Sequence, residues 1–145
     1  MTLHTCLLAS TLGTVAIGVA SAQGQGTSEL APLPPGATWS TLYHLYSHPD
    51  SDFVDDGATA EALSDFVVHR LATHWSTIAS LATLVAKDSA FGAFVLGHVD
   101  ATTDMSELHR IVRYAGSSCP RSARSFCLTL RAAAGKAIAQ AAQPN

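Results

Sequence analysis

The stretch that decides the fold is TAEALSDFVVHRLATHWSTIASLATLVAK, residues 59–87. Its apolar residues recur every three or four positions, which is the spacing that places side chains on one face of an α-helix. We expect one long helix here, or two helices with a bend near Thr73 and His74. The apolar positions are Leu63, Phe66, Val67, Leu71, Trp75, Ile78, Leu81, Ala82 and Val85.

The segments on either side of this stretch carry weaker helical patterns. Residues 39–47 place apolar side chains on one face, and Pro49 would end that helix. Asp88 is a good N-cap, because its carboxylate can accept hydrogen bonds from the first free backbone N–H groups of a helix over residues 89–98.

The C-terminal third predicts two more helices. Asp104 and Glu107 have the spacing of a capping box before an apolar face that ends near Tyr114, and Gly116 is a natural stop. An Ala-rich helix is expected over about 122–142. Because no alternating run bounded by hairpin turns is found, the sequence predicts an all-α fold, a small bundle of four or five helices.

The first twenty-two residues have the pattern of a signal peptide. An apolar run over residues 6–19 ends in Ala20-Ser21-Ala22, small residues of the kind that precede a secretory cleavage site. We therefore expect cleavage near Ala22, a periplasmic or extracellular location, and no transmembrane segment in the mature chain. The remainder suits a single domain: a flexible Pro- and Gly-rich lead over 23–38 and a helical domain over 39–145.

The cysteines are consistent with export. Cys6 lies within the signal peptide, which leaves Cys119 and Cys127. In an oxidising compartment such a pair usually forms a disulfide. Residues eight apart on one helix are about 12 Å apart, beyond the ~7 Å reach of a disulfide. If the bond forms within the chain, Cys119 therefore lies outside the helix that holds Cys127. Pro120 favours this because it disfavours helical geometry at the preceding residue. Intermolecular pairing and metal binding remain alternatives.

Charge is divided unevenly along the chain. From Gln23 to Glu107 there are eleven acidic residues and two basic ones, whereas no acidic residue follows Glu107 and six basic residues do. The basic segment could dock on the acidic helices, or it could form a face for an anionic partner. The residues of that candidate face are Arg110, Arg113, Arg121, Arg124 and Arg131.

A metal site is the second candidate. His44 and His48 are four residues apart on the expected first helix, a spacing that lets two imidazoles bind one ion. Asp50 and Asp52 follow closely and could add oxygen ligands. Two solvated surface histidines explain the same pattern, and the Asp-rich loop does not fit the register of an EF-hand. No other cofactor is predicted, and a divalent metal is the one cofactor that the residues suggest.

Recognisable catalytic motifs are lacking. The chain has no G-x-S-x-G, H-E-x-x-H, P-loop, dinucleotide fingerprint or C-x-x-C sequence. His69, His74 and His98 could act as general bases, but the sequence shows no partner for any of them, and His98 is expected to bond to the backbone. The basic segment lacks the interleaved aromatic residues that single-stranded nucleic acid would require.

We therefore expect a small exported helical binding protein without catalysis, which contacts a protein or an envelope component. A metal-binding protein that uses the first helix and the Asp-rich loop is the alternative. A hydrolase whose catalytic residues the sequence does not identify is a second alternative.

Overall fold

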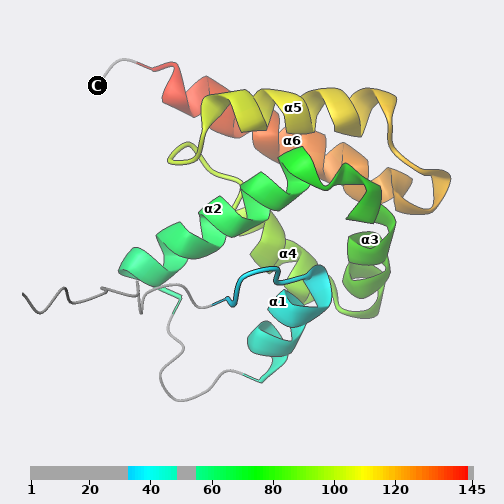
Figure 1. Ribbon diagram of the computed structural model, residues 1–145. Helices are drawn as coiled ribbons and strands as arrows, with labels where there is room; N and C mark the ends of the chain where they lie inside the picture. Colours follow the sequence, from blue (N-terminus) through cyan, green and yellow to red (C-terminus); the bar gives the residue numbers. More distant parts are fainter. Residues whose placement is uncertain (1–32, 49–54, 144–145) are drawn as a thin grey trace, which may run out of the picture.

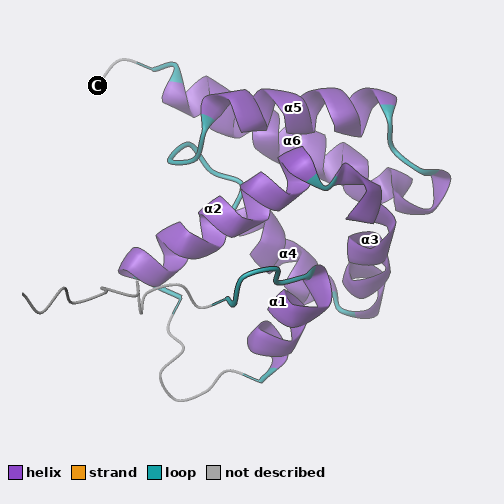
Figure 2. Cartoon of the chain, viewed as in Figure 1, coloured by secondary structure: helices purple, strands orange, loops and turns teal. Residues whose placement is uncertain are grey.

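The computed structural model describes residues 33–48 and 55–143. Figure 2 shows that these residues form helices and loops and that no strand occurs among them, which confirms the all-α bundle. The described residues form six α-helices, one more than the upper number expected, and two short 3-10 turns. They are α1 (Trp39–Ser47), α2 (Gly57–Thr73), η1 (Trp75–Thr77), α3 (Ile78–Lys87), α4 (Ser89–Gly97), α5 (Met105–Ser117), η2 (Arg121–Ala123) and α6 (Arg124–Ala141).

The long amphipathic stretch divides at His74, so the interpretation with two helices is correct. His74 leaves helical geometry, with φ −121° and ψ 43°. Two tryptophans fix the bend from either side: Nε1 of Trp39 donates to the hydroxyl of Thr77 at 2.8 Å, and Nε1 of Trp75 donates to the carbonyl of Ser118 at 2.9 Å. The bend is therefore set by tertiary contacts as well as by local sequence.

The predicted caps are present, with one difference. Asp88 accepts hydrogen bonds from the backbone N–H groups of Ala90 and Phe91, and Asp104 accepts one from the N–H of Glu107. The carboxylate of Glu107, however, lies 2.9 Å from Nδ1 of His69 on α2. The capping box is thus half formed, because its glutamate pairs with a neighbouring helix.

Gly116 does not end α5, contrary to the prediction. The helix continues to Ser117, and the positive φ angles among the described residues belong to Gly36 and Gly57. A Cβ added at Gly116 would lie 3.4 Å from Nη1 of Arg131. That distance is an ordinary van der Waals contact, so the glycine neither serves a turn nor is required by the neighbouring arginine on α6.

The core lies where α2, α3 and α4 meet the α5–α6 pair. In Figure 1, α5 and α6 run side by side in opposite directions, α2 lies against α5, and α1 packs beside α3. The apolar stripe of the long stretch is the centre of this core. Its fully buried side chains are Leu63, Val67, Val68, Leu71 and Leu81, joined by Phe91, Val95, Leu108, Ile111 and Leu130 from the other helices.

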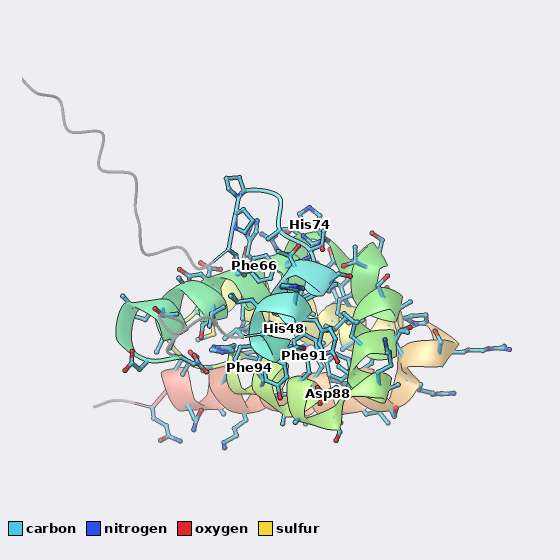
Figure 3. The ribbon with its side chains drawn as sticks, turned by 90° about the horizontal axis from the view of Figure 1, so that it is seen from below. His48, Phe66, His74, Asp88, Phe91 and Phe94 are labelled. Carbon is cyan, nitrogen blue, oxygen red and sulfur yellow. A yellow bond between two sulfur atoms is a disulfide. The ribbon has the colours of Figure 1, made fainter. Side chains whose placement is uncertain are left out.

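Aromatic packing attaches α1 to the rest of the bundle. The ring of Tyr46 lies 5.3 Å from that of Phe91 and 5.0 Å from that of Phe94, and Tyr43 also contacts Phe91. Figure 3 labels both phenylalanines beside α1. A nine-residue helix is too short to be stable alone, so these contacts and the burial of Trp39 and Leu42 in the core hold it.

Part of the expected flexible lead is packed. Ala37 is buried, Leu33 packs against the core, and Nη1 of Arg70 donates to the carbonyl of Ala37 at 2.7 Å. Contacts with the domain therefore begin before residue 39. The expected signal peptide and residues 23–32 of the lead lie outside the described residues. Within the described part, no helix is both long and apolar enough to span a bilayer.

The disulfide is formed as the spacing predicts. Cys119 and Cys127 are bonded, with their Cα atoms 6.3 Å apart. Cys119 lies in the connection after α5, and Pro120 has an extended ψ of 150°, so the chain turns before η2 and α6 begin. The bond ties this connection to the first turn of α6.

Candidate functional site

The candidate site is a pocket of about 300 Å³ between the end of α5 and the start of α6. Its charged lining consists of Arg121, Arg124 and Arg131, and we call it the arginine pocket. Ala115, Gly116 and Ser117 line it from α5. The disulfide and the side chain of Leu128 complete the wall.

Local sequence explains how three arginines reach one pocket. Arg124 and Arg131 are seven residues apart on α6, which is two helical turns, so they share a face. Arg121 precedes them in η2, inside the ring closed by the disulfide. The guanidinium of Arg131 lies beside Gly116 of α5.

These three guanidinium groups have no protein partner among the described residues. The close contacts between a basic nitrogen and a carboxylate found there are His69–Glu107 and His98–Asp55, so no arginine or lysine nitrogen lies within 4 Å of a described carboxylate. Among the same residues, Arg70 is the one arginine whose side chain donates a hydrogen bond. Among the described residues, the basic segment thus makes no close ion pair with the acidic helices.

The end of α5 affects the charge of the pocket. Its last carbonyl groups carry partial negative charge, which helps three like-charged side chains to gather there. α6 begins directly after η2, where the N–H of Arg124 bonds to the carbonyl of Arg121.

The other two predicted arginines do not line this pocket. Arg110 and Arg113 are exposed on α5, and the guanidinium of Arg113 lies 5.2 Å from the ring centre of its neighbour Tyr114. The structure therefore brings together three of the five arginines of the predicted face.

Leu128 adds an apolar element to the rim. Its side chain is 65% exposed, and no other large hydrophobic residue in the described part of the chain is exposed. An exposed leucine beside a cluster of cations is a combination that suits contact with a partner having both anionic and apolar groups.

The predicted metal ligands are described in part. His44 and His48 are exposed, and their rings are stacked with centroids 4.8 Å apart. Asp50 and Asp52 lie outside the described residues. Within the described ranges, no three His, Cys, Asp or Glu side chains gather closely enough to hold a metal ion. The four-residue site stays a prediction.

A buried polar network that the sequence analysis missed lies between α2 and the end of α4. The hydroxyl of Ser64 is 3.1 Å from Nδ1 of His98 and donates to Oδ2 of Asp100 at 3.0 Å. Nε2 of His98 is 3.5 Å from Oδ1 of Asp55. His98 thus bonds to side chains and not to the backbone as expected. No sequence signal could have found the network, because its members are up to 45 residues apart.

Burial sets the ionisation of this network. Burial lowers the pKa of His98, and the nearby carboxylates of Asp55 and Asp100 oppose the change without reversing it. Burial also works against ionisation of Asp100, but hydrogen bonds from Thr102 and Ser64 outweigh it and lower the pKa of Asp100. Asp100 therefore remains an anion that accepts a hydrogen bond from the hydroxyl of Ser64.

This network does not present a nucleophile to a substrate. Ser64 is 4% exposed and His98 is 6% exposed. The serine hydroxyl donates to Asp100, whereas a hydroxyl activated for attack would donate to a general base that is free to take its proton. In this arrangement the network joins the start of α2 to the loop after α4.

A second pocket, of about 340 Å³, lies beside α2 where the 33–37 segment passes over it. Figure 3 labels Phe66 and His74, which line it. The guanidinium of Arg70 lies 5.7 Å from the ring centre of Trp39 and 6.0 Å from that of Phe66. Its Nε is buried without a hydrogen-bond partner, and burial lowers its pKa.

Comparisons with known proteins identify no relative: no protein-family model matches the chain, and neither a curated protein nor a solved structure shows significant similarity to it. Arguments about its function therefore rest on its own residues.

Proposed function

We propose that the protein is a small exported binding protein without catalysis that contacts an anionic partner through the arginine pocket. The observation that carries this proposal is the gathering of Arg121, Arg124 and Arg131 without a carboxylate or hydrogen-bond partner among the described residues. An anionic group placed among them would accept charge-assisted hydrogen bonds, which are stronger than neutral ones.

The partner class follows from the rim of the pocket. The exposed side chain of Leu128 suits a surface with apolar groups next to its charges, as in an anionic lipid layer or an acidic protein. We favour an envelope component that carries anionic headgroups. The disulfide supports an oxidising compartment, where an exported protein meets such a component.

Export itself is tested by intact-mass measurement on protein purified from its native host. The proposal expects an N-terminus at Gln23, after removal of residues 1–22. A product that retains Met1 would contradict the location.

Binding is tested by co-sedimentation of the mature chain with vesicles of phosphatidylglycerol and phosphatidylcholine. The proposal expects binding that weakens steeply with salt, because exposed charges are screened beyond about 8 Å at physiological ionic strength. Vesicles of phosphatidylcholine alone should bind much less.

Matched charge reversals locate the surface. The pair Arg124→Glu and Arg131→Glu should abolish vesicle binding and leave the helical circular dichroism spectrum intact. The pair Arg110→Glu and Arg113→Glu makes the same change in net charge outside the pocket, and it should retain most of the binding. Equal losses in the two pairs would show that bulk charge and not the pocket is recognised.

Metal binding is the second candidate function. The stacked rings of His44 and His48 place two exposed imidazoles one helical turn apart, as a shared ion requires. Zinc should then raise the melting temperature, and His44→Ala should remove the rise. His109→Ala, which changes an exposed histidine on α5, is the control. No zinc-dependent shift in the parent protein would exclude the site.

A further inference from the structure

The disulfide and the arginine pocket are parts of one structural unit. The bond between Cys119 and Cys127 closes a ring of the chain that contains Arg121 and Arg124. Arg131 lies one turn beyond the ring on α6. Two of the three guanidinium groups are therefore positioned by a segment whose ends are covalently joined.

The disulfide restrains the segment between α5 and α6 together with several noncovalent contacts. The carbonyl of Ser118 accepts the indole N–H of Trp75, the N–H of Ala123 bonds to the carbonyl of Pro120, and the side chain of Ala123 is buried in the core. The side chain of Arg121 is exposed and makes no hydrogen bond to a described residue. Without the disulfide, the exposed part of this segment around Arg121 would be less restrained, and the three arginines would come together less often.

The chemistry of the lining residues favours a phosphate group as the anion. Guanidinium groups bind phosphate oxygens through paired N–H donors, and a tetrahedral group can accept from several arginines at once. The pocket is large enough for such a group, and its three arginines supply the donors.

We propose that the arginine pocket recognises a phosphate group, and that it does so more tightly when the Cys119–Cys127 disulfide is intact. This inference rests on the proposed function and adds the chemistry of the ligand and its dependence on oxidation. Loss of the bond in a reducing environment would release the partner.

The first test uses inorganic phosphate as the probe, titrated calorimetrically at constant ionic strength. The parent protein is compared with the variant Cys119→Ala, Cys127→Val, which removes the bond and keeps an apolar side chain at the buried position 127. We expect about tenfold weaker phosphate binding in the variant, or about 1.4 kcal/mol. A melting curve checks that the variant is folded at the assay temperature.

If this variant is unfolded, the parent protein in glutathione buffers replaces it. Two glutathione molecules reduce the bond to two thiols and form one glutathione disulfide. Phosphate must then raise the oxidised fraction, because a ligand that prefers the oxidised form stabilises it by the same factor. An oxidised fraction that does not change with phosphate would overturn the inference.

A second variant keeps the disulfide and tests geometry. Arg124→Ser combined with Ser125→Arg preserves composition and net charge but moves one guanidinium to Ser125, which lines a different groove, beside Phe126 and Val85. Phosphate binding should again fall about tenfold, or about 1.4 kcal/mol. Unchanged binding would contradict recognition by the pocket.

The outcomes separate this inference from the proposed function. Equal phosphate affinity in the folded disulfide-free variant and the parent would overturn the dependence on oxidation and leave the binding function in place. Binding to phosphatidylglycerol vesicles without binding to inorganic phosphate would overturn phosphate recognition. Displacement of the protein from vesicles by inorganic phosphate would support a lipid phosphate as the natural source. Absence of both kinds of binding would overturn the proposed function as well.

Discussion

Two regions of the molecule contain arginines without a nearby carboxylate, and they use them differently. At the α1–α2 end, Arg70 lies over two aromatic rings and donates to the carbonyl of Ala37. At the α5–α6 end, Arg121, Arg124 and Arg131 line a pocket and donate to no described residue. Absence of an acidic partner is common to both regions, so it does not by itself mark a binding site.

The difference lies in what each guanidinium contacts. Arg70 joins the segment before α1 to α2. Its side chain is half-buried, and this burial lowers its pKa. The pocket arginines are exposed, and two of them lie in the ring that the disulfide closes. Arg70 accordingly contributes to stability, whereas the pocket arginines are available to a partner.

The largest effect on stability is expected from Arg70→Ala. Loss of the hydrogen bond to Ala37 and of the contacts with Trp39 and Phe66 should lower the free energy of unfolding by about 3 kcal/mol. Arg124→Ala should change it by less than about 0.5 kcal/mol, as for most surface substitutions. Urea denaturation of both variants checks the comparison.

Similar losses in the two variants would break the distinction between the regions. Arg70→Lys sharpens it, because lysine keeps the charge but lacks the planar group that stacks on rings. This variant should lose most of the stability that Arg70→Ala loses.

Removal of the disulfide should have the next largest effect. At the α5–α6 end the disulfide holds the connecting segment in place, as the contacts of Arg70 with aromatic rings do at the α1–α2 end. Closing a loop this short is worth about 2–3 kcal/mol through the entropy of the unfolded chain. Urea denaturation of the disulfide-free variant should give a free energy of unfolding lower by that amount. A cost near zero would mean that helix packing alone fixes the start of α6.

Acid should act on the His98 network and leave the charge of the arginine pocket unchanged. The pKa of His98 is lowered in the folded protein from its ordinary value of 6.5, so the unfolded chain binds more protons just below that pH. Stability should therefore fall as the pH drops below about 6.5, through the folded pKa. Asp55 and Asp100, which face His98, limit the size of this effect.

The contribution of His98 to this pH dependence is measured by comparing melting curves of the parent and of His98→Gln at several pH values. The variant should be less stable at neutral pH and should have a shallower dependence on pH between 6.5 and 5. The same slope in both proteins would assign the acid sensitivity to other groups.

Much of the fold follows from local patterns in the sequence. The spacing from Leu63 to Val85 predicted the central helices and the position of the bend, and Asp88 and Asp104 act as the caps that their positions indicated. The disulfide followed from two cysteines and the geometry of a helix. These features depend on residues close together in the chain, which is why sequence alone could predict them.

The features that sequence missed depend on residues far apart. Gly116 was interpreted as the end of a helix because glycine often ends helices, yet α5 continues through it to Ser117. The partners of His98 come from distant segments and carry no pattern. The arginine face was predicted as five residues, but the positions of α5 and η2 decided which three share a pocket.

The most direct test of the central claim is a phosphate titration followed by NMR of the arginine side-chain Nε–H resonances, at constant ionic strength. The claim predicts saturable shifts for Arg121, Arg124 and Arg131, with one shared dissociation constant, and no shift for Arg70, which serves as an internal reference. Small, non-saturating shifts spread equally over all arginines, with Arg70 among them, would contradict the claim.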